Sequence, residues 1–283
     1  MVVAPVLWSS AGVVTRHVER AEPFEQVFWR SLFAFLFVAL MLLLQGVSPW
    51  SATRKAGLAG LFSGAMWAVM FTAFVVALSL TTTANTLVVM SVAPLLTAFL
   101  SFVILKEKVS MRTWLAAGAA AVGIAWMFHN GFTGGHLAGM LVALLIPVAS
   151  AANLIALRAA AARVDLVPAV MLGGALSCLI ALPLALPFNA SPKDLLLLGS
   201  LGVFQLGLPC MLLVVASRTL RPPEIALLGL LEVVLGPLWA WIGAGEAPGS
   251  ATLYGGAIVL AALVLNEIST LREKTHISSE KPV

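Results

Sequence analysis

The sequence predicts an all-α integral membrane protein whose ten transmembrane helices form two five-helix repeats of inverted topology. The composition, the spacing of the apolar stretches and the similarity between the two halves of the chain support this prediction. Hydrophobic residues make up 61% of the 283 positions and charged residues only 10%, and the mean hydropathy is +1.04. A soluble domain carries roughly 25% charged residues, so the composition excludes a soluble monomer.

Ten apolar stretches follow one another with short connections between them. A helix needs roughly 20 apolar residues to cross a bilayer, and hydrocarbon satisfies no backbone N–H or C=O group, so spans of this kind must be helical. The first stretch is short, because only fifteen residues precede Arg16, and the sequence leaves open whether Met1 truncates it. It lacks the basic region and cleavage site of a signal peptide. The predicted spans are residues 1–17, 24–46, 55–79, 83–104, 110–128, 136–159, 166–188, 192–218, 223–243 and 249–268.

Lysine and arginine are distributed unevenly between the two sides of this predicted bundle. If the N-terminus is cytoplasmic, twelve of the 16 fall on the cytoplasmic side and four on the outer side. Cytoplasmic loops carry the excess of basic residues, so the distribution predicts that both termini are cytoplasmic and favours an even number of spans. The four outer residues are Arg16, Arg20, Arg30 and Lys193.

The two halves of the chain are similar in sequence. A polar, glycine-rich turn at 129–136 divides the chain into a first repeat, 1–130, a second repeat, 131–268, and a cytoplasmic tail, 269–283. A shift of 139 residues aligns 83–114 with 222–253, and both segments reach a glutamate, Glu107 or Glu246, before they turn into another apolar helix. An odd number of spans per half inverts the second copy, as in many secondary transporters. We expect the two glutamates to anchor loops or form charge pairs.

Four motifs, in order and spread over the whole chain, resemble those of the drug/metabolite transporter superfamily in its EamA-type, ten-helix branch. They are VLWS at 6–9, FWRSLFAFLF at 28–37, APLLTAFLSFVILKEKVSMRTW at 93–114 and LLEVVLGPLWAWIGAGEAPG at 230–249. VLWS and ALSL at 77–80 are similar to bacterial aromatic amino-acid exporters. Thr72, Ser91 and Ala93 are small where those exporters are rich in aromatic residues, which favours a broader range of amino acids or metabolites.

The resemblance implies a secondary carrier in a bacterial-type cytoplasmic (inner) membrane. It would export amino acids or related small metabolites by alternating access around a central cavity, lined mostly by helices 1, 3, 4, 6, 8 and 9. The implied partners are a small-molecule substrate and the lipid bilayer, with no nucleic acid and no cofactor. The substrate, the coupling ion, the direction of flow and the oligomeric state stay open.

Glu232 is the only acid placed deep within a predicted span. A buried charge costs roughly 2.5–3.5 kcal/mol on insertion scales, so its presence needs a reason. It is a candidate contact for a substrate amine or a site of proton coupling, and the alternative is a brace for the helix irregularity before Gly236 and Pro237. Arg30 could attract a substrate carboxylate, but more often such a residue snorkels outward or pairs with Glu22, Glu25 or a backbone carbonyl.

Other polar, aromatic and proline residues within the spans are weaker candidates. Tryptophans inside a span can line a cavity, and amides must face another helix or a wet space, whereas serine and threonine commonly bond to their own helix. Prolines break helices and free carbonyl groups. Gly57, Gly60 and Gly64 lie along one side of the third span and predict close helix packing. The candidate cavity residues are Trp8, Ser9, Trp67, Thr72, Asn85, Ser91, Asn153, Gln205, Glu232 and Trp239, and the candidate helix breaks are Pro94 and Pro237.

Two other functions compete with amino-acid transport. Efflux of drugs or lipophilic cations needs an acid and aromatic walls, which Glu232 and Trp8 could supply. A membrane-embedded enzyme is a remote alternative, because the four histidines do not have the H-E-x-x-H spacing of a metalloprotease. The sequence therefore indicates neither an enzyme nor a metal site.

Overall fold

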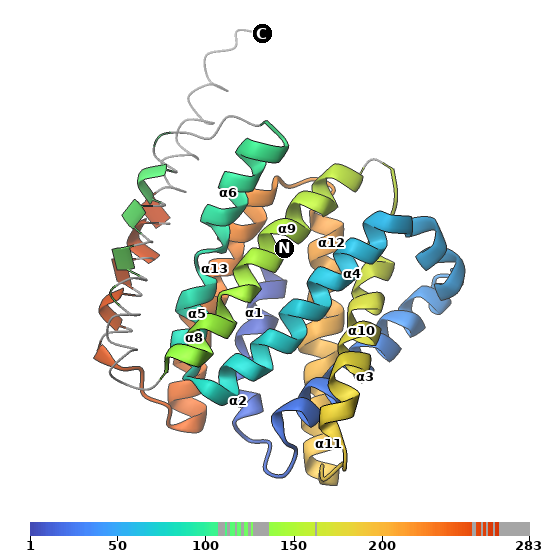
Figure 1. Cartoon of the computed structure of the whole chain (residues 1–283), viewed down its shortest axis with the longest axis horizontal. Helices are drawn as coiled ribbons and strands as arrows, with labels where there is room; N and C mark the ends of the chain where they lie inside the picture. Colours follow the sequence, from blue (N-terminus) through green and yellow to red (C-terminus); the bar gives the residue numbers. More distant parts are fainter. Residues whose placement is uncertain are drawn as a thin grey trace, which may run out of the picture.

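A computed structural model shows a bundle of helices standing side by side (Figure 1). It describes residues 1–106, 111, 114–116, 118–119, 122–123, 126, 136–161, 163–250, 253–255, 257–258, 260–262 and 264–265. Parts of the predicted spans 110–128 and 249–268, and the whole tail 269–283, lie outside these residues. The helices are α1 (Val3–Ser9), α2 (Ala11–Thr15), α3 (Pro23–Leu44), α4 (Pro49–Leu80), α5 (Thr83–Met90), α6 (Ala93–Ile104), α8 (Leu137–Ala143), α9 (Leu145–Ala160), α10 (Val167–Ala185), α11 (Pro192–Ser200), the π-helix η1 (Leu201–Gly207), α12 (Leu208–Ala216) and α13 (Pro222–Ala244).

Seven helical segments within the described part are long and apolar enough to cross a membrane, and two shorter apolar helices cover Val3–Thr15 and Leu253–Ala262. The prediction of an all-helical, multi-pass membrane protein is therefore confirmed for the described residues. The count of ten helices and the inverted relation of the two halves stay predictions. The seven segments are Pro23–Leu44, Pro49–Leu80, Thr83–Ile104, Leu137–Ala160, Val167–Ala185, Pro192–Ala216 and Pro222–Ala244.

Several spans that the hydropathy predicts as single helices contain irregular turns. The segment Thr83–Ile104 is interrupted between Met90 and Ala93. Pro94 lies in the first turn of α6, where the backbone N–H would have no partner within the helix, so its absence costs no hydrogen bond. The segment Pro192–Ala216 widens into the π-helix η1 just before Pro209. Pro209 cannot donate to the carbonyl of Gln205 four residues earlier, so the irregularity coincides with a position where the α-helical ladder cannot continue.

Helix α10 packs tightly against α3 and α4, and small residues permit the contact. A Cβ atom on Gly173 of α10 would lie 2.4 Å from Cβ of Trp67 in α4, and one on Gly64 would lie 2.8 Å from Cβ of Leu172. Gly64 therefore has the predicted packing role. Gly57 does not share it, because its φ of 57° and ψ of −146° break α4 into two helical parts, a backbone conformation that favours glycine.

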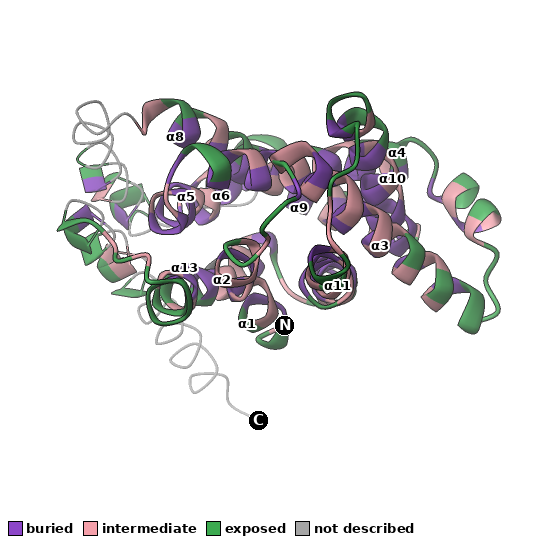
Figure 2. Cartoon of the chain, turned by 90° about the horizontal axis from the view of Figure 1, so that it is seen from below, coloured by how far each residue is buried: buried purple, intermediate pink, exposed green. Residues whose placement is uncertain are grey.

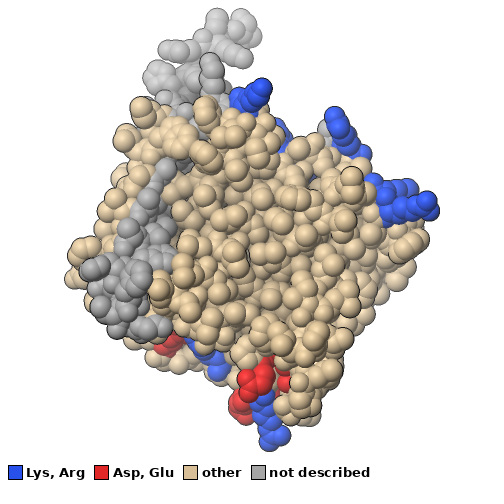
Figure 3. Space-filling model, viewed as in Figure 1, with Lys and Arg blue, Asp and Glu red and all other residues tan. Residues whose placement is uncertain are grey.

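The outside of the bundle is apolar. On α3, Leu36, Leu40, Leu43 and Leu44 are 50–71% exposed, whereas Ala34, Val38 and Leu42 on the other face are buried. Figure 2 shows buried residues turned toward neighbouring helices and exposed ones at the periphery. Charged side chains gather at two opposite ends of the face in Figure 3, with an uncharged belt between them. This distribution fits a protein whose belt contacts lipid.

Candidate functional site

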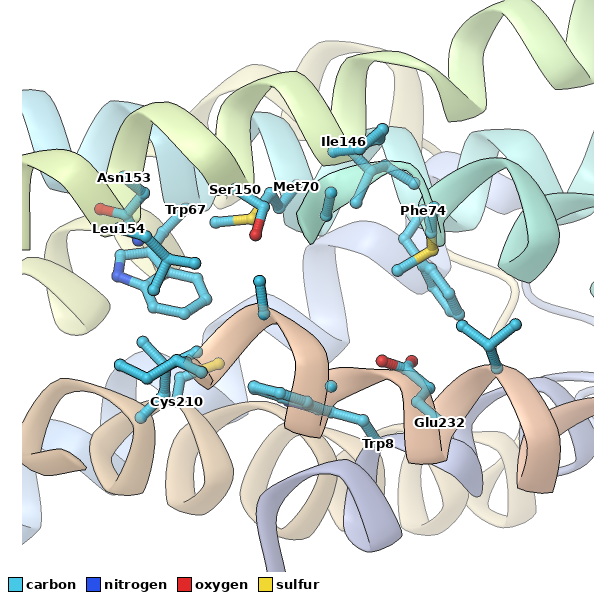
Figure 4. Close-up of a pocket in the computed structure, with 18 of the residues that line it drawn as sticks. Trp8, Trp67, Met70, Phe74, Ile146, Ser150, Asn153, Leu154, Cys210 and Glu232 are labelled. Atoms are coloured by element: carbon cyan, nitrogen blue, oxygen red, sulfur yellow. The ribbon is translucent and has the colours of Figure 1, made fainter. Parts of the chain in front are cut away.

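A cavity of about 130 Å³ lies inside the bundle, lined by residues of α1, α3, α4, α9, η1, α12 and α13 and of the region where α5 meets α6 (Figure 4). It therefore draws on both halves of the chain. Most of its walls are apolar, with Phe71, Phe74, Met70 and Leu206 among them. An engineered apolar cavity of ~150 Å³ holds benzene, so a space of this size suits a small solute.

Six of the ten candidate cavity residues from the sequence line this space: Trp8, Trp67, Ser91, Asn153, Gln205 and Glu232. Figure 4 shows Trp8, Cys210 and Glu232 on one side of the cavity and Trp67, Ser150 and Asn153 on the opposite side. Pro94 also lines the cavity, beside the interruption between α5 and α6. Pro237 lies within α13, which continues through it. Whether these residues bind a substrate stays a prediction.

The other four candidates lie elsewhere and have hydrogen-bond partners. Trp239 donates from Nε1 to Oγ of Ser9 at 3.2 Å, and Ser9 donates to the carbonyl of Val6 at 2.6 Å, which ties α13 to α1. Thr72 shares a hydrogen bond of 3.0 Å with Ser177. Asn85 donates from Nδ2 to Oγ1 of Thr81 at 3.0 Å, in the turn between α4 and α5.

Arg30, which the sequence suggested could attract a substrate carboxylate, is also a cavity residue, although it was not among the ten candidate cavity residues. Its side chain is 1% exposed and lines the cavity. Nη2 donates to the carbonyl of Phe71 at 3.3 Å, and the guanidinium carbon lies 5.4 Å from the centre of the Phe74 ring. The backbone carbonyl was one of its expected partners, but outward snorkelling is wrong. Nε and Nη1 have no hydrogen-bond partner among the described residues.

The expected pairing of Arg30 with Glu25 is also wrong, because other donors occupy the Glu25 carboxylate. It accepts hydrogen bonds from the backbone N–H groups of Asn189 at 3.0 Å and Ala190 at 2.8 Å, and from Nε1 of Trp29 at 3.2 Å. Glu25 is fully buried and anchors the loop that follows α10. A signal for Arg30 was available in the sequence, since an arginine deep in an apolar span requires a partner at that depth.

Glu232 brings a second charge-bearing group to the same cavity. It lies on α13 and is 8% exposed. Arg30 and Glu232 interact electrostatically, but no direct ion pair joins these two described residues. Each charge in a low-dielectric space stabilises the other.

Buried polar atoms that lack a partner within the protein concentrate around the cavity. Eight such side-chain atoms occur among the described residues, and four of them belong to residues that line it. Buried polar groups in native proteins almost always have a hydrogen-bond partner, so this set of atoms indicates a place for a polar solute or water. The four atoms are Nε and Nη1 of Arg30, Nε1 of Trp67 and Oε1 of Gln205.

The position of Arg30 depends on a close contact between α3 and η1. A Cβ atom on Gly202 of η1 would lie 2.5 Å from Cβ of Phe33 and 2.6 Å from the carbonyl oxygen of Arg30. Only glycine allows η1 to approach α3 this closely. The same π-helical turn carries Gln205 to the cavity, and π-bulges are frequent at functional sites.

One end of the bundle is held together by the Glu246 carboxylate. Glu246 follows α13 and accepts hydrogen bonds from Nε of Arg16 at 2.9 Å, from the backbone N–H of Thr83 at 2.5 Å and from Oγ1 of Thr83 at 2.8 Å. Arg16 also donates from Nη2 to the carbonyl of Thr81 at 3.1 Å. This group of residues, the Glu246 cluster, joins the ends of α2, α4, α5 and α13. The expectation that Glu246 forms a charge pair is confirmed; Glu107 lies outside the described residues.

The fold and the cavity thus define a multi-pass helical membrane protein with a small, charged internal site. Residues 1–129 match the sequence profile of the EamA-like transporter family. No curated protein matches the chain. Among solved structures, one titled "Crystal structure of protein" is 19% identical, with a TM-score of 0.71 over 94% of this chain and 95% of that one. That likeness is one of fold.

Proposed function

We propose that this protein is a secondary transporter that exports amino acids or related small metabolites by alternating access. The observation that carries the proposal is the internal cavity, because it is lined by both halves of the chain and holds Arg30 and Glu232. The match of residues 1–129 to the EamA-like transporter family supports transport of a small molecule. The Glu246 cluster would be the closed gate at one end of the bundle, and the inverted repeats would exchange conformations to open it.

We place the gate on the side away from the cytoplasm. On the face in Figure 3, acidic side chains gather at one end and only basic ones are visible at the other. Arg54, Lys55, Arg158 and Arg218 all lie beside helix ends that the predicted topology puts in the cytoplasm, and basic residues are enriched on the cytoplasmic side. In this arrangement both termini are cytoplasmic and the protein lies in an inner membrane.

Efflux of lipophilic cations is the second candidate function. The aromatic walls formed by Trp8, Trp67, Phe71 and Phe74, together with Glu232, favour it. Arg30 argues against it, because its guanidinium lines the same small space and would repel a cation that has no negative group of its own.

Counterflow into proteoliposomes tests the proposal. Proteoliposomes loaded with an unlabelled amino acid would be diluted into a solution of the same amino acid in labelled form, at two pH values. Liposomes without the protein would be the control. Accumulation above the control would support a carrier. No accumulation of any amino acid, metabolite or lipophilic cation by a folded protein would contradict it. A pH effect that disappears in Glu232→Gln would support proton coupling at this carboxylate.

A further inference from the structure

We propose that the cavity binds its substrate through two opposite charges and is selective for zwitterions. Arg30 would bind the carboxylate and Glu232 the ammonium group of an α-amino acid with an apolar side chain. The inference rests on the proposed transport function and names the substrate class within it.

Arg30 is held in a position that leaves two donors for a ligand. Its Nη2 is engaged with the carbonyl of Phe71, and the ring of Phe74 lies beside the guanidinium group. These contacts fix the side chain, while Nε and Nη1 remain without a partner in the part of the chain that the structure describes. A hydrogen bond from a guanidinium N–H to a carboxylate oxygen is charge-assisted and therefore stronger than one to a neutral acceptor. A carboxylate is therefore the ligand group that best satisfies this buried residue.

The Glu232 carboxylate supplies the complementary point. It lines the same cavity from α13, and no hydrogen bond from the described residues engages it directly. The ammonium group of the substrate would form an ion pair with Glu232. The substrate's own carboxylate, held in place by Arg30, would stabilise the ammonium group from the other side.

Charge balance explains why a zwitterion fits better than an anion or a cation. Arg30 and Glu232 together carry no net charge when both are ionised, and a zwitterion adds none. A substrate with one net charge would leave an uncompensated charge inside the membrane, which is costly. The apolar remainder of the wall, including Met70, Leu206 and Leu230, suits an aliphatic side chain rather than a further polar group.

Competition in the counterflow assay separates the two charge contacts. Labelled L-leucine would be the probe, and unlabelled L-leucine, leucinol and N-acetyl-leucine the competitors. Leucinol lacks the carboxylate and N-acetyl-leucine lacks the ammonium group. We expect each analogue to compete about 10- to 100-fold more weakly than leucine, because a hydrogen bond to a charged group contributes about 1.5–3 kcal/mol and each 1.4 kcal/mol is tenfold.

Charge-removing variants then assign each contact to a residue. Arg30→Gln should reduce the advantage of leucine over leucinol while the advantage over N-acetyl-leucine persists, and Glu232→Gln should do the reverse. These ratios compare two competitors on one protein, so a general loss of activity does not imitate them. Lys193→Gln is the matched control, because it removes an exposed charge that pairs with Glu19 outside the cavity.

The outcomes distinguish this inference from the proposed function. Equal competition by leucine and either analogue on the wild-type protein would overturn the two-point site and leave the carrier intact, as would accumulation of a lipophilic cation instead of leucine. Failure to accumulate any solute would overturn both. If Arg30→Gln does not fold, the wild-type competition alone still decides, and Arg30→Lys should retain the preference for leucine with weaker binding.

Discussion

Ser177 shows how a single hydroxyl group can connect three membrane helices. Its Oγ atom lies on α10, accepts a hydrogen bond from Ser31 of α3 at 3.0 Å and shares one of 3.0 Å with Thr72 of α4. Hydrogen bonds between side chains of membrane helices average about 0.6 kcal/mol each. Two bonds therefore contribute about 1 kcal/mol, which is enough to measure but too little to hold three helices without the close packing around them.

We expect Ser177→Ala to lower the free energy of unfolding by about 1 kcal/mol, because both bonds are lost, while the substrate preference stays unchanged. Unfolding in a graded series of denaturing detergent would measure the loss. Ser79→Ala is the control, because Ser79 is exposed and, among the described residues, bonds only to its own helix at Val76. A loss equal to that of the control would show that the three-helix contact adds no stability.

Side-chain chemistry predicted that Glu232 and Trp8 would be at the cavity, since an acid or an indole at membrane depth requires a special environment. It could not predict that Thr72 lies outside the cavity that its neighbours on α4 line. Met70, Phe71 and Phe74 line the cavity, whereas Thr72 points toward α10. The difference is a rotation of about 100° per residue around the helix axis, and it depends on which helices pack on either side. Only the assembled bundle specifies that rotation.

At the scale of elements, glycine sets the distance between η1 and α3. Gly202→Ala would place a methyl group against Cβ of Phe33 and the carbonyl oxygen of Arg30. Both atoms are attached rigidly to α3, so neither can move unless the helix moves. We therefore expect the helices to separate and Arg30 to shift, which should weaken the proposed binding of leucine about tenfold or more and lower stability by about 1–3 kcal/mol, the usual range for overpacking.

Gly199→Ala, on the preceding turn, is the matched control for this prediction. Its added Cβ would lie 3.5 Å from the ring of the same Phe33, an ordinary contact. Alanine favours a helix by up to about 1 kcal/mol over glycine, so this variant should be neutral or slightly stabilising. Counterflow and detergent unfolding of both variants would compare them, and equal behaviour would exclude a special role for the close contact at Gly202.

The approximate positions of the long described helices were predictable from hydropathy, but their interruptions were predictable only in part. Pro94 indicated where the fourth span breaks, because a proline early in a helix marks its start. The similar cue at Pro237 did not interrupt α13. The π-helical turn before Pro209 depends on how η1 packs against α3 at Gly202. Proline supplies the local tendency, and the neighbouring helix decides whether the chain bends, widens or continues.

At the scale of the whole molecule, the Glu246 cluster joins helix ends at one end of the bundle, and the proposed transport mechanism requires that this end open. Arg16 and Glu246 are 33% and 16% exposed at their side chains, so water screens the ion pair in part, and exposed pairs contribute only about 0–1 kcal/mol. The hydrogen bonds from Thr83 to the same carboxylate add to this. The ion pair and these hydrogen bonds together are strong enough to favour the closed state of the proposed gate and weak enough to let it open.

We expect Glu246→Gln to shift the population toward a state open at this end by about 1–2 kcal/mol, a factor of about 5–30, because the amide loses the ion pair and weakens the bonds from Thr83. Cys210 can report the opening, since it lines the cavity and is 1% exposed. In a Cys178→Ala background, a membrane-impermeant thiol reagent added at the Glu246 end should label Cys210 several-fold faster in the variant than in the parent.

Lys193→Gln removes an exposed charge at the same end and should leave the labelling rate of Cys210 unchanged. An unchanged rate in Glu246→Gln as well would mean that packing of α2 against α13, rather than this carboxylate, keeps the cavity closed.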